Sequence, residues 1–165
     1  MRRGDRYRYL LILAGLVVLH FSLRPRLGDD RVAPDFLLLA LLLYAIRAKP
    51  GRSAAAGFVV GLLKDALTPA SFGAAALAHT LVGYLSAWAK ALFFAENIFV
   101  TGCLLFAGTW TRNFLLAVVS GRFKGGLLGW ELLVWAPLQS LTTALTGMLV
   151  LGLFGRWMLV RAPNQ

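Results

Sequence analysis

The sequence predicts an all-α integral membrane protein, a bundle of six transmembrane helices, on the strength of three observations. Two uncharged runs, 66–89 and 132–155, each contain 24 residues, more than the ~20 that an α-helix needs to cross a bilayer. Apolar residues make up 59% of the chain, and its mean hydropathy is +0.72. Charged residues make up only 15%, too few to cover a water-facing surface. The length fits a single polytopic domain, 1–165.

The first two expected helices lie in the N-terminal third. Four arginines in the first eight residues precede the apolar stretch 9–23, and no small-residue cleavage site follows it, so we expect an uncleaved first helix. The next apolar run, 36–46, has 11 residues, which is about 16 Å of helix. It can span only if flanking residues are drawn in, which gives an expected helix over 32–48.

The third and fourth expected helices differ in length and in how they end. The third run, Ser53 to Leu63, is again short and ends on Lys64 and Asp65, within an expected helix over 53–67. Such a short helix either thins the bilayer or buries polar ends among its neighbours. The fourth helix is expected over 70–89, beginning after Pro69.

The fifth and sixth expected helices complete the bundle. The fifth, over 98–119, is interrupted by Arg112 and Asn113. The sixth, over 132–155, carries Pro137 where it can open or kink the first turns.

Six crossings place both termini on the same side of the membrane, and the basic residues indicate which side. Ten Lys and Arg residues fall on the side of the termini and six on the opposite side, with Arg112 inside a helix. Because cytoplasmic loops carry the excess of Lys and Arg, we expect both termini in the cytoplasm. The six opposite residues are Arg24, Arg26, Arg31, Lys64, Arg122 and Lys124.

The net charge of +10 is assigned to this topology and to anionic membrane lipids, because the basic residues are scattered between apolar runs. No nucleic-acid partner is expected. No catalytic arrangement, nucleotide-binding loop or metal-spaced cluster is found, so we expect no enzyme activity, cofactor or metal. The single cysteine, Cys103, excludes an intrachain disulfide. His20 and His79 are interpreted as hydrogen-bonding residues in helix packing.

Small residues recur every four positions along one face of the third expected helix, and the fourth helix offers a matching face. Close packing drives helix association in lipid, and small residues let a neighbouring backbone approach. Internal packing and the binding of a partner helix both remain open as uses of these faces. We expect partner binding to depend on the packing that Gly57 and Gly61 set. The faces comprise Ser53, Gly57, Gly61 and Asp65 on one helix and Ala76, Thr80, Gly83 and Ala87 on the other.

Four polar residues are candidates for a role inside the membrane: Asp35, Asp65, Arg112 and Gln139. An isolated charge there costs at least ~2.5 kcal/mol, so a buried Asp65 requires a cation. Lys64 points about 100° away around the helix, which leaves Arg112 as the expected partner. Solvation at the membrane surface is the alternative for both residues. Gln139 begins a polar stripe that either lines a cavity or hydrogen-bonds a neighbouring helix.

Three segments then point to a family: PDFLLL at 34–39, GFVVGLLKD at 57–65 and HTLVGYL at 79–85, with Gly73 between the last two. In order and spacing they resemble the MreD family of bacterial rod shape-determining proteins, and the length and six-helix plan agree. The resemblance covers 34–85, and beyond Trp88 only the hydropathy matches. Residues 68–71 depart from the Ser-Gly type of turn expected there, which leaves the shape of that loop open.

The resemblance implies a non-enzymatic scaffold of the bacterial inner membrane that supports the peptidoglycan elongation complex. Its implied partner is MreC and, through MreC, the MreB filament, RodA and a class B penicillin-binding protein. It also implies a bundle similar to the substrate-binding subunits of energy-coupling-factor (ECF) transporters, and it brings no catalytic residues.

A second function, from a different class, is a small-molecule-binding transporter subunit with a pocket among its short helices. Two observations oppose it: no pair of broken helices lies in corresponding halves, and polar residues look too sparse to recognise a vitamin. A central cavity lined by several polar groups and holding a ligand would reverse this preference.

Overall fold

The computed structural model describes residues 3–29, 31–67, 72–93, 97–120 and 129–158. Over these residues the chain forms six α-helices and no strand, which confirms the all-helical prediction. A 3₁₀ turn, η1 (Arg24–Arg26), follows the first helix, and a π-helical segment, η3 (Glu131–Trp135), leads into the last. The expected turn at 68–71, and Arg122 and Lys124, lie outside the described residues. The six helices are α1 (Arg3–Ser22), α2 (Phe36–Ala45), α3 (Pro50–Leu67), α4 (Ala74–Phe93), α5 (Ile98–Ser120) and α7 (Ala136–Met158).

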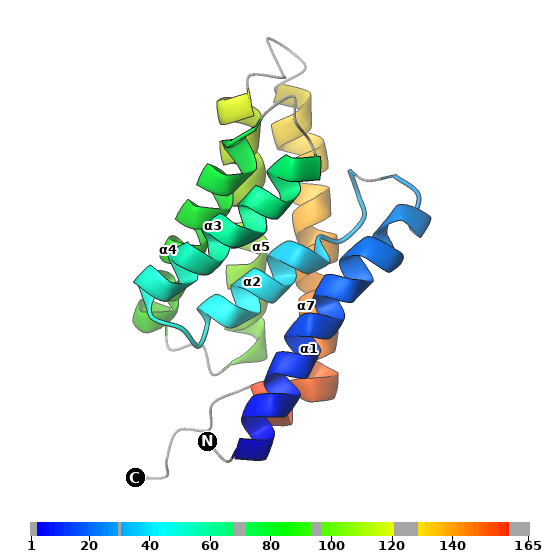
Figure 1. The fold of residues 1–165 in the computed structure, drawn as a ribbon. Helices are drawn as coiled ribbons and strands as arrows, with labels where there is room; N and C mark the ends of the chain where they lie inside the picture. The colour runs from blue at the N-terminus through cyan, green and yellow to red at the C-terminus, as the bar shows by residue number, and fades with distance from the viewer. Residues whose placement is uncertain (1–2, 30, 68–71, 94–96, 121–128, 159–165) are drawn as a thin grey trace.

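The helices run alternately up and down a single bundle (Figure 1). α1, α3 and α5 end at the upper end of the view, and α4 and η3 begin there, whereas α1 begins and α7 ends at the lower end. The connection after η1 turns back into the bundle before α2 begins. That path carries the residues just before α2 away from the surface and toward the other helices.

α2 is a core helix, with nine of its ten residues buried. Asp35 caps its N-terminus, because Asp35 Oδ1 accepts the Leu38 N–H at 3.1 Å. At about 15 Å, α2 covers half of a ~30 Å hydrocarbon core. The helix is therefore shorter than the expected 32–48, since the cap fixes its start and a turn follows Ala45.

α3 and α4 pack backbone against backbone along their small-residue faces. A Cβ atom added at Gly57 would lie 2.7 Å from the carbonyl carbon of His79, and one added at Gly61 would lie 2.6 Å from the backbone nitrogen of Ala76. Neither position has room for a side chain, so the two faces cover each other and are closed to a partner helix. The same interface contains Ser53 and Gly83, and Thr80 bonds to the Ala76 carbonyl within α4.

Among the described residues, two helices are long and apolar enough to cross a membrane: α5 and the continuous helix over Glu131–Gly155, which joins η3 to α7. Two shorter apolar helices cover Tyr7–Ser22 and Phe36–Ala45. Large apolar side chains point outward from all five long helices, a surface that favours lipid over water. Examples are Leu11, Phe58, Leu81, Val118 and Leu149.

Candidate functional site

Asp35 joins two cationic side chains in the interior of the bundle. Its carboxylate is fully buried, and its Oδ2 atom accepts from Arg112 Nη2 at 2.7 Å and also from Lys64 Nζ. The Arg112 and Lys64 side chains are only 9% and 11% exposed. Charges this deeply buried are stable only when paired, so one carboxylate supports two cations. We call Asp35, Lys64 and Arg112 the Asp35 cluster.

Two more helices are attached to Asp35. Nδ1 of His20, on α1, lies 3.4 Å from Asp35 Oδ1 and accepts the Leu37 N–H at 3.3 Å. The backbone N–H of Asp35 donates to Oγ1 of Thr143, on α7, at 3.2 Å. The start of α2 is thus held by residues from four other helices, and a shift of any of them changes the surroundings of one carboxylate.

A chain of amides continues from Arg112 toward α7. Arg112 Nη1 donates to Asn113 Oδ1 at 2.5 Å, and Asn113 Nδ2 donates to Gln139 Oε1 at 2.9 Å. Gln139 Nε2 then donates to the carbonyl of Ala33 at 3.3 Å. Gln139 therefore hydrogen-bonds a neighbouring helix and also lines the pocket described below.

Asp65 is buried but does not pair with Arg112, so the expected Asp65–Arg112 pair is wrong. Its two carboxylate oxygens accept the N–H groups of Ala75 and Ala76 at 3.0 and 2.9 Å. These belong to the first turn of α4, whose N–H groups have no partner within the helix. Consecutive residues of a helix point about 100° apart, so Lys64 reaches Asp35 while Asp65 faces α4.

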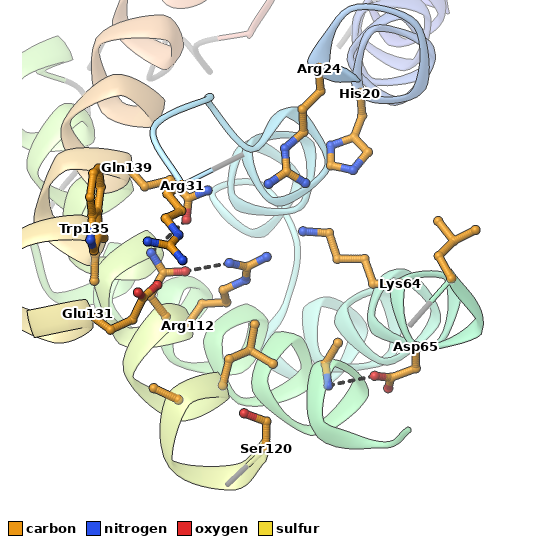
Figure 2. Close-up of a pocket in the computed structure, with 16 residues that line it drawn as sticks. His20, Arg24, Arg31, Lys64, Asp65, Arg112, Ser120, Glu131, Trp135 and Gln139 are labelled. Carbon is orange, nitrogen blue, oxygen red and sulfur yellow. Dashed lines mark hydrogen bonds between the residues drawn. The ribbon is translucent and has the colours of Figure 1, made fainter. Parts of the chain in front are cut away.

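A pocket of about 420 Å³ opens beside the Asp35 cluster (Figure 2). It includes the last residues of α3 and α5, Leu67 and Ser120, so it lies at the end of the bundle that is uppermost in Figure 1. The charged ends of Arg24, Lys64 and Arg112 point toward one another from η1, α3 and α5. Folding gathers at this pocket polar residues that are sparse along the sequence, and whether they recognise a vitamin stays a separate question of function. Its polar lining residues include His20, Arg24, Arg31, Lys64, Arg112, Trp135 and Gln139.

The lining of this pocket is rich in hydrogen-bond donors. Its lining supplies guanidinium, ammonium and indole donors, and the Arg31 guanidinium lies over the Trp135 ring at 5.5 Å. Within the described ranges, no three His, Cys, Asp or Glu side chains come together in a way that would hold a metal ion.

One feature of the sequence, the position of three basic residues on the same side of the membrane, is consistent with the pocket. Arg24, Arg31 and Lys64 were counted on the same side of the membrane, opposite the termini, and in the structure they line the same pocket as Arg112. The distribution of basic residues along the sequence indicates topology but not the path of the chain after η1, which brings Asp35 within reach of α3 and α5.

The chain was compared with protein families, with curated proteins and with solved structures. The family model described as rod shape-determining protein MreD matches residues 6–160, nearly the whole chain. No curated protein and no solved structure gives a match. The likeness to ECF transporter subunits therefore stays a prediction.

Proposed function

This chain belongs to the MreD family of rod shape-determining proteins, and from that premise we propose that it is a scaffold of the bacterial inner membrane that binds MreC. The family is a membrane protein family with a role in rod shape determination, and it is not a known enzyme family. The match over 6–160 is the observation that carries the proposal. Through MreC, the scaffold supports MreB, RodA and a class B penicillin-binding protein.

The proposed topology has six crossings, with both termini in the cytoplasm. The alternating direction of the six helices and the ten-to-six distribution of basic residues support it. α2 is too short to span alone, but it is shielded by its neighbours and need not match the bilayer thickness. In this topology the pocket lies on the periplasmic side.

The close packing of α3 on α4 supports partner binding indirectly. Because Gly57 and Gly61 hold the two backbones together, they fix the position of the outward faces of both helices. A partner helix meets part of those outward faces, where Phe58 and Leu77 are exposed. Spreading the helix pair changes the surface that the partner meets.

Affinity purification of the tagged chain from native membranes, with mass spectrometry of the co-purifying proteins, tests the proposal. We expect MreC among the specific partners of the wild type. Gly61→Leu should lose MreC, because leucine has no space between α3 and α4. Val59→Leu should keep MreC, because it exchanges one exposed apolar side chain for another and leaves the contact between α3 and α4 unchanged. Recovery of well-folded wild-type chain without MreC would contradict the proposal.

One observation favours the alternative function of a small-molecule-binding transporter subunit: the polar pocket beside the Asp35 cluster. The same purification separates the two functions. A transporter subunit should bring down the membrane and ATP-hydrolysing subunits of a transporter, and a scaffold should bring down MreC.

A further inference from the structure

Among the described residues that line the pocket, positive side chains outnumber negative ones. Four cationic side chains line it, namely Arg24, Arg31, Lys64 and Arg112. Asp65 and Glu131 are its acidic lining residues, and Asp35 lies behind the wall against Lys64 and Arg112. Four cations therefore meet three carboxylates in this part of the described structure, which leaves the balance among these groups positive.

Several of the described side chains around the pocket can only donate hydrogen bonds. Guanidinium and ammonium groups only donate, and the oxygens of Asp35 and Asp65 already accept from other groups. Among the described residues, Nε of Arg112 and Nε1 of Trp135 are buried beside the pocket with no acceptor. A ligand that brings acceptor oxygens satisfies such a site, and a cationic ligand does not.

The directions of the cations narrow the class of anion. Arg24, Lys64 and Arg112 approach a common space from three different elements (Figure 2). A planar carboxylate offers two oxygens in one plane, whereas a tetrahedral phosphate offers oxygens in several directions. Arginine forks also match phosphate in a bidentate manner. The volume of about 420 Å³ accommodates a phosphate with part of the molecule that carries it.

We propose that this pocket binds a phosphate group, held by Arg24, Lys64 and Arg112 at the mouth of the bundle. The phosphate belongs either to a lipid headgroup that enters from the bilayer or to a soluble phosphate ester. This site is independent of MreC binding, and it adds a ligand to a protein otherwise proposed as a scaffold. Occupancy would connect η1, α3 and α5 through one anion.

The test uses the full-length protein in detergent and in nanodiscs. In detergent, melting temperature is measured in inorganic phosphate, in glycerol 3-phosphate and in chloride at equal ionic strength. In nanodiscs of phosphatidylcholine with 10% phosphatidic acid, retained lipid is identified by native mass spectrometry. A soluble ligand raises the melting temperature in phosphate or in glycerol 3-phosphate, and a lipid ligand appears as retained phosphatidic acid.

Two neighbouring arginines supply a matched pair of variants. Arg24→Gln should weaken binding roughly tenfold or more, because a charged hydrogen-bond donor is lost. Arg26→Gln should bind like the wild type, since Arg26 lies on the same turn, is exposed and does not line the pocket. If Arg24→Gln fails to fold, Arg31→Gln, at an exposed lining residue, replaces it. Absence of binding in both arms, or equal binding by the Arg24 or Arg31 variant and the Arg26 variant, overturns the proposal.

Discussion

A single added methyl group tests the contact between α3 and α4. In an open helix, Gly→Ala stabilises by about 1 kcal/mol, because alanine is the better helix former. At Gly61 the added Cβ would lie 2.6 Å from the backbone nitrogen of Ala76, closer than atoms can approach without repulsion. Backbone atoms cannot rotate away as a side chain can, so the two helices must separate.

The expected magnitude follows from these two opposing effects. Overpacking costs about 1–3 kcal/mol, and a backbone collision belongs in the upper half of that range. After the gain in helix propensity is subtracted, Gly61→Ala should be destabilised by roughly 1–2 kcal/mol. At ~2–4 °C per kcal/mol for a chain of this size, its melting temperature should fall by roughly 2–8 °C. Separation would also lengthen the bonds from Asp65 to Ala75 and Ala76.

Gly152→Ala is the matched control, because Gly152 lies in α7 and nothing lies within 4 Å of a Cβ added there. It should keep or raise the melting temperature. Both variants would be purified in the same detergent and followed by circular dichroism at 222 nm during heating, with size-exclusion profiles recorded beforehand. If the two substitutions shift the melting temperature in the same direction, α3 and α4 are not in backbone contact at Gly61.

Three further predictions concern the charged residues and the topology. Asp35→Asn should cost about 3–5 kcal/mol, because it leaves Lys64 and Arg112 buried without their shared carboxylate. The amount of folded protein on size exclusion should fall. The double variant with Asp35→Asn and Lys64→Met should recover part of that amount. A wild-type amount for Asp35→Asn alone would show that the Asp35 cluster does not stabilise the fold. Asp65→Ala should lower the free energy of unfolding by about 1 kcal/mol through loss of the α4 cap, and Asp65→Asn should lower it less. Exchanging Asp65 with Arg112 should give no more folded protein than either single variant. A gain in folded protein on that exchange would support the Asp65–Arg112 pair expected from the sequence. A C-terminal alkaline phosphatase fusion should be inactive and a C-terminal green fluorescent protein fusion should fluoresce, and the reverse pattern would rule out six crossings with cytoplasmic termini.

Hydropathy was sufficient to predict elements whose character is set by their own residues. The start of α5 at Ile98 and the extent of the helix over Glu131–Gly155 follow from long apolar runs between charged or turn-forming residues. The face of Gly57 and Gly61 follows from helical periodicity alone. These features are local, so one stretch of sequence contains the information needed to predict them.

The partner of Arg112 could not be found in this way. Asp35 was a candidate for a role inside the membrane, but nothing in its local sequence links it to Arg112, which follows 77 residues later. Asp35 is buried because the connection after η1 returns into the bundle, a property of the whole fold. Lys64 and Asp65 show the same limit, since adjacent residues find partners on different helices. Sequence identified the candidate charges, and only the packing of the helices decided which of them meet.

The three members of the Asp35 cluster leave the ribosome at very different times. Lys64 follows Asp35 by 29 residues and Arg112 follows it by 77. At ~5–20 residues per second, Arg112 is synthesised roughly 4–15 s after Asp35. Throughout that interval the first helices hold a carboxylate with only part of its final surroundings. The N-terminal half is therefore a poor candidate for independent assembly, and delivery of the fifth helix is the step at which the nascent bundle can close.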